Sequence, residues 1–486
     1  MKSSFFLRTK IPVILLGFLV LGFSYGCQKD IIETDNAPDP VSDEVTLKGA
    51  KIENLMVITT SETLPAGFEK ALSPYGQIVN TIPEIGAVVI RPADSNSAGK
   101  IARLRGVQAV VPDLKVRWIE PNEFVSEANP TSIGDNEPSF WRQWGMDAIN
   151  APEAWNAGWT GEGVKVFILD SGIDKDNPDL EPNLNTTLSA SFVPNENYYV
   201  EDGLFFNHGT HVAGIIAAAD NGKGVIGVAP HAEIVAVKVL SEYNGSGDFS
   251  WINAGIVYAA NNEADVVNMS LGATFARNGY YYDEEDVLQK IPAVYMQSLI
   301  ITQQRAVNYA VKKGAVVVVS AGNDYMNADG NAFLFTVPAD LENVIAISAT
   351  APYGWILNQN GSLDIPASYT NYGKSLVALA APGGDVDFPG LDSNGLPYYR
   401  YDMIFSTGAG PNPNDGLYYF YYAVGTSMAS PHVAGVAALI IGKNGGEMDP
   451  HEVTKQLFNT ADKLDGQGMS PYYGNGRVNA YRAVTE

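Results

Sequence analysis

Phe167-Ile-Leu-Asp-Ser-Gly-Ile-Asp174 is an apolar run that ends in an aspartate and a glycine turn. The apolar run before Asp170 covers residues 164–169. Similar apolar runs alternate with helical stretches along the chain, at 233–239, 266–270, 315–320 and 344–349. Nearly continuous apolar strands are typical of a parallel sheet covered by helices on both faces. Active sites in such sheets lie at the carboxyl ends of the strands, which is where Asp170 stands. The pattern predicts an α/β fold with Asp170 at its site.

Two further blocks place reactive residue types beside glycines and small residues. They are Asn207-His-Gly-Thr-His-Val-Ala-Gly214 and Gly425-Thr-Ser-Met-Ala-Ser-Pro-His-Val-Ala-Gly435. A serine hydroxyl is a poor nucleophile at neutral pH, so it needs an imidazole to accept its proton and a carboxylate to orient that imidazole. Ser427, His208 and Asp170 provide these three groups. Any one block alone would be weak, because each also occurs in cores, loops or metal sites.

Ser427 comes just before a helix that we expect over 428–441. The free N–H groups and the dipole at a helix N-terminus favour a negative oxygen there. We expect Pro431 in the first turn, where its missing N–H removes no intrahelical bond. His211 is interpreted as a buried packing residue, and a metal site made by His208 and His211 is the rival interpretation.

The region before these blocks has a different organisation. Residues 28–49 are polar and aperiodic, as in a flexible tether. Strands are expected over 54–60, 77–82, 87–90 and 107–111, and helices over 65–73 and 97–104. This β-α-β-β-α-β order predicts a small ferredoxin-like α+β sandwich. Residues 121–139 again have the composition of a linker.

The N-terminus has the three parts of an export signal. Lys2, Arg8 and Lys10 are followed by an apolar run over 11–23 and then by Cys27, the only cysteine, so no intrachain disulfide can form. The chain carries 30 basic and 54 acidic residues, for a net charge of −24. Such acidity argues against nucleic acid or anionic membranes as partners. It suits a secreted protein that binds cations, and simple solubility explains it equally well.

All three blocks resemble the subtilisin-like serine proteases (subtilases), whose triad has the chain order Asp, His, Ser. Gln143-Trp-Gly145, Ala151-Pro-Glu-Ala-Trp155 and Gly227-Val-Ala-Pro230 also recur in that family, and the resemblance runs from Trp141 to Val484. It implies a subtilisin-like peptidase domain over 140–486, a secreted serine endopeptidase that hydrolyses peptide bonds through an acyl-enzyme on Ser427.

Further roles follow from the resemblance. Asn323, in Ser320-Ala-Gly-Asn323, corresponds to the family's oxyanion asparagine. Ser270, Leu271 and Gly272 resemble the strand that pairs with a peptide substrate. With Ala321 and Gly322 they suggest an apolar wall with no charge at its base, and hence a preference for large apolar or aromatic side chains.

The N-terminal segments resemble other parts of a protease precursor. Residues 50–120 are similar to the family's inhibitory propeptides, which would make this domain an intramolecular inhibitor, with the maturation cut in 121–139; an unrelated spacer domain is the alternative. Residues 1–26 and Cys27 resemble a lipoprotein signal, with 27–49 as the tether; ordinary signal cleavage, with Cys27 incidental, is the alternative. We therefore expect an exported monomer, lipid-anchored at the outer membrane or cell surface or released after maturation, with the membrane contacted only through the lipid.

Asp179, Asn221 and Glu137 match positions that bind structural calcium in many subtilases, and their oxygens suit a hard cation. An unoccupied glycine turn is the alternative. Two stretches, 277–302 and 384–403, exceed the minimal fold and could serve specificity or regulation, or be decoration. Two other functions stay open at this point. One is a catalytically inert binding protein at the cell surface, and the other is an esterase that uses the same triad.

Overall fold

The computed structural model describes residues 53–119, 124–128, 137–201, 206–411, 416–466 and 468–486. The predicted signal peptide, the tether, Cys27 and much of the 121–139 linker lie outside the described residues. Among the helices of the described part, none is long and apolar enough to cross a membrane.

A mostly parallel sheet carries the candidate site. Its strand order is β18-β17-β15-β11-β7-β9-β8, with β19 paired to β17. Among the described strand pairings of this sheet, only that of β17 with β18 is antiparallel. The strands are β7 (Lys165–Asp170), β8 (Ala190–Ser191), β9 (Glu233–Lys238), β11 (Val266–Met269), β15 (Val316–Ser320), β17 (Ile345–Ala351), β18 (Ile365–Pro366) and β19 (Leu379–Pro382). The five predicted strands correspond to β7, β9, β11, β15 and β17, and the α/β fold is confirmed.

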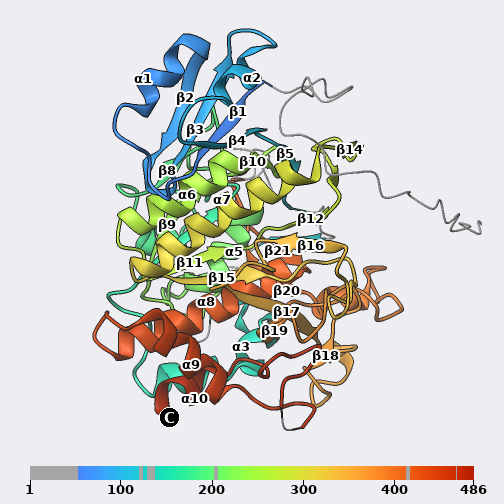
Figure 1. Cartoon of the computed structure of the whole chain (residues 1–486). Coiled ribbons are helices and arrows are strands. Elements are labelled where there is room, and N and C mark those ends of the chain that lie inside the picture. Colours follow the sequence, from blue (N-terminus) through green and yellow to red (C-terminus); the bar gives the residue numbers. More distant parts are fainter. Residues whose placement is uncertain (1–52, 120–123, 129–136, 202–205, 412–415, 467) are drawn as a thin grey trace, which may run out of the picture. The chain divides into compact units, whose positions relative to one another are not determined.

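Helices cover both faces of this sheet. Along β7, Val166 and Ile168 join a core with helices α5 and α8, whereas Phe167 and Leu169 join another core with α6 and α7. This is the alternation of a pleated strand. Figure 1 shows α6 and α7 side by side. The helices of this part are α3 (Trp144–Ala148), α4 (Ala151–Asn156), α5 (His208–Ala217), α6 (Phe249–Asn261), α7 (Ala293–Lys312), α8 (Thr426–Lys443), α9 (Pro450–Thr460) and α10 (Ala480–Thr485).

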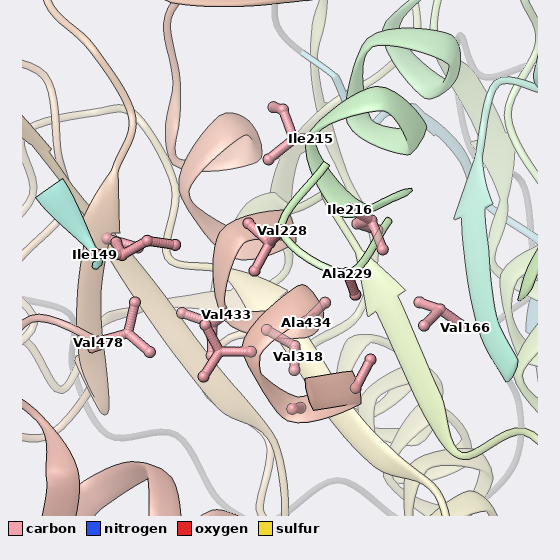
Figure 2. Close-up of a cluster of buried hydrophobic side chains, with 14 of the residues drawn as sticks. Ile149, Val166, Ile215, Ile216, Val228, Ala229, Val318, Val433, Ala434 and Val478 are labelled. Carbon is pink, nitrogen blue, oxygen red and sulfur yellow. The ribbon is translucent and has the colours of Figure 1, made fainter. Parts of the chain in front are cut away.

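The core on the α5 and α8 face holds in place the two helices that begin at the site. In Figure 2, Ile215 and Ile216 of α5, Val433 of α8 and Val166 of β7 lie in one apolar cluster. These side chains are almost fully buried. Because α5 starts at His208 and α8 starts one residue before Ser427, this packing sets where both residues lie.

Helix α8 differs from its prediction at the N-terminus. It begins at Thr426 instead of at residue 428, so Pro431 lies inside the helix and not in its first turn. A proline there deprives the carbonyl four residues earlier of its donor. That carbonyl belongs to Ser427, and the Ser270 hydroxyl donates to it instead at 2.8 Å. A side chain from the neighbouring segment thus replaces the missing helix bond.

The predicted N-terminal sandwich is present as a four-stranded antiparallel sheet of order β2-β3-β1-β4. One face packs on its own two short helices, and the other, with Met56 and Ile58, belongs to the core of α6 and α7. Helix α1 starts at Phe68 because Gly67, with φ 76°, is not helical. The elements are β1 (Leu55–Thr59), α1 (Phe68–Leu72), β2 (Gly76–Ile82), β3 (Ala87–Pro92), α2 (Ser97–Ile101) and β4 (Val107–Pro112).

Besides the main sheet and the N-terminal sandwich, the described residues form four smaller sheets. Strand β5 pairs with β10, β12 with β16, β13 with β14, and β21 lies between β20 and β6. All of these pairings are antiparallel. The strands are β5 (Lys115–Arg117), β6 (Phe124–Ala128), β10 (Ser246–Asp248), β12 (Ala273–Ala276), β13 (Tyr280–Tyr282), β14 (Leu288–Lys290), β16 (Leu334–Val337), β20 (Ile404–Thr407) and β21 (Tyr419–Ala423).

Candidate active site

Asp170 and His208 form a buried pair at the end of β7. Both carboxylate oxygens of Asp170 lie near His208 Nδ1, at 3.0 and 2.9 Å, and the Ser171 N–H donates to Oδ1 at 2.6 Å. A carboxylate at Nδ1 leaves Nε2 as the ring nitrogen that can take up a proton. His208 Nε2 is buried and has no hydrogen-bond partner among the described residues.

Helix α5 can come this close to Asp170 because its second residue is Gly209. A Cβ built at Gly209 would lie 2.2 Å from the Gly172 carbonyl oxygen and 3.1 Å from Asp170 Oδ1. The helix is capped by Asn207, whose side-chain oxygen accepts from the Thr210 N–H at 2.8 Å. The Asn207-His-Gly-Thr block therefore caps the helix and fits its first turn against the aspartate.

Ser427 lies in the first turn of α8, which packs against α5. Its hydroxyl donates to the Ser270 carbonyl oxygen at 3.2 Å, and no hydrogen bond joins it to His208 in this state. Ser427 is largely buried, at 6% exposure. The structure thus joins Asp170 to His208 directly and brings Ser427 near them through helix packing.

Asn323 follows β15 and is tied to the residue before Ser427. Its side-chain oxygen accepts from the Thr426 N–H at 2.9 Å and from the Thr426 hydroxyl at 2.8 Å. The amide oxygen is thereby occupied, and the amide nitrogen is the group left to donate. The preceding Gly322 has φ 101°, a left-handed conformation that favours glycine and turns the chain here.

A cavity of about 820 Å³ adjoins these groups. Gly272, Gly322, Asn323, Thr426 and Ser427 line it. Of the other predicted substrate-binding residues, Ser270, Leu271 and Ala321 do not line it; they are buried at 0–1% exposure. Leu271 and Gly272 lie between β11 and β12; Gly272 lines the cavity, whereas Leu271 joins the core of α6 and α7.

The cavity wall is more charged than the sequence indicated. Arg117, Asp283, Asp286 and Asp324 are among its lining residues, together with the aromatic segment Tyr280–Tyr282. Asp283, Asp286 and Tyr280–Tyr282 come from the extra stretch 277–302, which forms the β13–β14 hairpin and the first half of α7. The signal available in the sequence was the run Asp283-Glu-Glu-Asp286 in an insertion.

The segment after the N-terminal sandwich, residues 114–119, runs along this cavity and contains the strand β5. Strand β5 pairs with β10, and the Gly272 N–H donates to the Trp118 carbonyl oxygen at 2.9 Å. The Trp118 side chain is 2% exposed, donates through Nε1 to the Gly247 carbonyl oxygen at 2.8 Å, and makes an edge contact with Phe249 at 5.0 Å. Residues 114–119, the tail strand, thus occupy the edge predicted to pair with a substrate.

Two carboxyl groups meet where the tail strand begins. Asp113 accepts from the Ser250 N–H at 3.2 Å and from its hydroxyl, and Asp248 lies close to it. Burial raises the pKa of both carboxyl groups, and the Asp113 charge raises the pKa of Asp248 further. The other charged groups that act on Asp248 are those of Lys115, Glu284 and Glu53.

Three buried oxygen atoms around the 220–225 loop have no hydrogen-bond partner among the residues that the structure describes. They are Glu137 Oε2, Asp179 Oδ1 and Asn221 Oδ1. The other oxygen of each carboxylate is hydrogen-bonded: Glu137 Oε1 accepts from the Gly222 N–H at 2.9 Å, and Asp179 Oδ2 accepts from the Val225 N–H at 3.0 Å. Burial raises the pKa of Asp179 to about 7, and the Glu137 charge adds to the shift.

Those oxygens fit a hard cation. Carboxylate and amide oxygens, completed by backbone carbonyls, are the donors that calcium prefers. Within the described residues no group of three or more His, Cys, Asp or Glu side chains is placed to hold a metal, so only two carboxylates are available here. Buried polar atoms are normally satisfied, so three unpaired oxygens together point to a missing partner.

The two other histidines of the blocks are buried in the core. His211 Nε2 lies 3.0 Å from the Tyr421 carbonyl oxygen, and burial lowers the pKa of His211 to about 3. His432 Nδ1 lies 2.8 Å from the Met428 carbonyl oxygen, and burial lowers its pKa to about 4. Both are neutral packing residues at neutral pH, as the sequence predicted for His211.

Comparison with known proteins gives concordant matches. The sequence profile of the subtilase family matches residues 161–476. The chain is 33% identical over 444 residues to the thermophilic serine proteinase of Bacillus sp. (strain AK1), covering 90% of this chain and 89% of that protein. It is 37% identical over 389 residues to subtilisin E of Bacillus subtilis (strain 168), covering 80% and 81%.

Solved structures agree on the fold. The epidermin leader peptide processing serine protease of Staphylococcus aureus superposes with a TM-score of 0.68 at 24% identity, covering 90% of this chain and 98% of that one. A protease of Pseudoalteromonas arctica PAMC 21717 superposes with a TM-score of 0.54 at 31% identity, covering 72% and 98%.

Proposed function

The chain belongs to the subtilase family and is a serine endopeptidase, and we propose that it acts through Ser427, His208 and Asp170 and is made as an exported, self-processing zymogen. The observation that carries the assignment is the buried Asp170–His208 pair, with its free Nε2, beside a serine in the first turn of α8. Nucleophilic catalysis needs these three groups together, and the packing of α5 against α8 supports their assignment to one site.

In the proposed mechanism, a substrate strand pairs with Gly272 and places its scissile carbonyl beside Ser427. The Ser427 hydroxyl leaves the Ser270 carbonyl and gives its proton to His208 Nε2 as Oγ attacks the substrate carbon. The resulting oxyanion accepts from Asn323 Nδ2 and the N–H groups at the start of α8. His208 then protonates the leaving amine, and water hydrolyses the acyl-enzyme by the same steps.

The tail strand supports the zymogen assignment. Its pairing with Gly272 would exclude a substrate from the same edge, and residues 50–120 would thereby inhibit the enzyme. On the far side, Phe124 pairs with Ala423, four residues before Ser427. These two flanks support a maturation cut between Ile119 and Phe124, at the start of the linker.

The sandwich also contacts the peptidase domain away from the groove. Arg305 of α7 donates to the carbonyl oxygens of Thr59 and Ile85, each at 3.3 Å. Asn261 donates to Glu84 at 2.8 Å. Such contacts suit a domain that stays docked after the cut, as an intramolecular inhibitor must.

We also propose a structural calcium ion held by Glu137, Asp179 and Asn221. The unpaired buried oxygens of these three residues support it. A bound cation would supply the missing partner and neutralise two buried carboxylates. Since the chain has one cysteine, the ion would replace a disulfide in fixing the 220–225 loop to the start of the peptidase domain.

Export and lipid attachment at Cys27 remain proposals that rest on the sequence of the first 27 residues. We propose that the lipid-anchored precursor is held at the outer membrane or cell surface until maturation releases the peptidase domain. Cys27→Ser should shift the precursor from the membrane fraction or block its processing. Unchanged membrane partition of the variant would contradict the lipid anchor.

Labelling with a fluorophosphonate, followed by peptide and ester turnover, tests the catalytic assignment. The wild-type enzyme should be labelled at Ser427, whereas Ser427→Ala should be unlabelled and should accumulate as a full-length precursor. Since the triad acts as a unit, Ser427→Ala and the double variant with His208→Ala should lose similar activity. Ser430→Ala is the matched control, because it removes a neighbouring hydroxyl and should keep the label.

Other outcomes separate the alternatives. A wild-type protein without label would be an inert binding protein, and turnover of esters without peptides would make it an esterase. N-terminal sequencing of the active form should give a start between residues 120 and 124. A start at Cys27 would contradict self-processing.

A further inference from the structure

The β13–β14 hairpin contacts the tail strand through charges that the catalytic mechanism does not use. Arg117 donates through one guanidinium nitrogen to Asp286 Oδ2 at 2.6 Å and through the other to the Glu284 carbonyl oxygen at 3.2 Å. Lys115 Nζ lies 2.8 Å from Glu284 Oε2. The hairpin turn thus holds two basic side chains, two positions apart on one strand.

The two faces of the tail strand are sorted by charge. Val116 and Trp118 point into the core and are 1–2% exposed, whereas Lys115 and Arg117 face the hairpin. This follows from the period of two in an extended strand. Any extended peptide that pairs with Gly272 in the same way would present its side chains to the hairpin at these same two positions.

The hairpin is built to hold its acidic turn in place. Asp283 does not bind the tail; its Oδ1 accepts from the N–H groups of Glu285 and Val287 at 3.0 and 2.9 Å. Tyr281 is 4% exposed and packs near Phe275, so the hairpin is anchored to the core. Anchoring leaves Glu284 and Asp286 at fixed positions along the groove.

We propose that this hairpin is a specificity element: Glu284 and Asp286 select peptide substrates that carry basic side chains at the positions of Arg117 and Lys115. In a substrate, the residue at the position of Trp118 is the one whose carbonyl oxygen accepts from the Gly272 N–H. The position of Arg117 is one residue before it, and the position of Lys115 is three residues before it. The tail strand then inhibits by presenting the enzyme's preferred pattern. The inference rests on the proposed function, since it takes the tail strand to lie where a substrate lies.

Matched peptides test the proposal with the mature enzyme obtained from the full-length chain. One peptide copies residues 113–128, and its partners carry Gln in place of Arg117 or of Lys115. Exposed and half-buried ion pairs are weak, so kcat/KM should fall about three- to fivefold for loss of the arginine and about twofold for loss of the lysine. Both ratios should shrink in high salt, because the pairs are partly exposed.

Enzyme variants assign the effect to the hairpin. Asp286→Asn should bring the Arg-to-Gln ratio from three- to fivefold to below twofold, and Glu284→Gln should bring the Lys-to-Gln ratio from about twofold to about one. Glu285→Gln is the control, since it removes an equal charge from the exposed side of the same turn and should leave both ratios as in the wild type. An equal loss of preference in all three variants would mean a general attraction to an acidic protein and would overturn the proposal.

The salt series on the wild-type enzyme keeps the test decisive if a variant fails to fold. Equal turnover of the basic and neutral peptides at low salt would overturn the specificity proposal while supporting the endopeptidase. Failure to cleave any of the peptides, by an enzyme that the fluorophosphonate does not label either, would overturn the proposed function itself.

Discussion

Replacing Ser270 by alanine should destabilise the protein at the carbonyl of the proposed nucleophile. Pro431 has no N–H to offer the Ser427 carbonyl, and the Ser270 hydroxyl, at 2.8 Å, takes its place. The same Oγ lies 2.8 Å from Ser430 Oγ and 3.0 Å from Asn268 Nδ2. Ser270, Ser430 and Asn268 are fully buried. A buried polar group left unpaired costs about 1–3 kcal/mol. We therefore expect Ser270→Ala to lower the free energy of unfolding by about 2 kcal/mol.

A second substitution isolates the hydrogen bond from everything else at this position. Pro431→Ala restores an N–H whose partner in a regular helix is the Ser427 carbonyl. In the wild type that carbonyl already has a donor, whereas in Ser270→Ala it has none. Pro431→Ala should therefore stabilise the Ser270→Ala protein by about 1 kcal/mol more than it stabilises the wild type. Changes in unfolded-chain freedom occur in both backgrounds and cancel in the comparison.

The assay is denaturant unfolding of the four proteins, each also carrying Ser427→Ala so that none digests itself. The quantity of interest is the coupling energy of the double-mutant cycle. The slope of the free energy with denaturant should be the same in all four, as a check on cooperative unfolding. Additive effects, with a coupling below about 0.3 kcal/mol, would refute the idea that the serine substitutes for the missing helix bond.

Three further outcomes are expected. Asn323→Ala should lower kcat with little effect on KM, by the roughly 10²–10³-fold already known for the oxyanion asparagine of this family and not worked out from these distances; an unchanged kcat would remove Asn323 from the mechanism. Added calcium should raise the thermal stability of the mature enzyme over that in chelator, by about 2.7 kcal/mol at a hundredfold excess over Kd, and Asp179→Ala should abolish the difference; equal melting temperatures in the wild type would exclude the site. Since burial beside Asp113 raises the pKa of Asp248 in the docked state, that state holds a proton which the free enzyme releases. Docking of the N-terminal domain should therefore be strongest near the ordinary carboxyl pKa of about 4 and weaken towards alkaline pH. Size-exclusion chromatography after the cut should find more free enzyme at pH 9 than at pH 6. An equal pH response in the Asp248→Asn variant would contradict this cause.

The sequence was most informative where burial dictates residue type. Strands such as β7 and β15 are apolar on both faces because helices cover both faces, and their pattern identifies them without any tertiary knowledge. The same reasoning located Asp170, the last residue of β7, whereas the role of Asn323, shortly after β15, came from the family resemblance. The small sandwich was equally readable, because each element is short, local and separated by turn residues.

The differences arise where distant segments decide. The start of α8 could not be read from Pro431, because the compensating donor is Ser270, 157 residues away in the chain. The charged wall of the cavity was missed for a similar reason. The acidic turn Asp283–Asp286 forms its ion pair with Arg117, and Arg117 lies 169 residues before Asp286 in the chain. Pairings over such separations have no local pattern in the sequence.

The tail strand has a consequence for how maturation is driven. Pairing of Trp118 with Gly272 and of Phe124 with Ala423 holds the chain on both sides of the interval in which we propose the cut. The new amine and the new carboxylate would thus stay close together, at an effective concentration far above that of two separate molecules. At such proximity the enzyme would also rejoin the two ends, so the first cut alone would be reversible. Irreversibility would come only from a later event that removes one end, such as digestion of the sandwich by another copy of the enzyme.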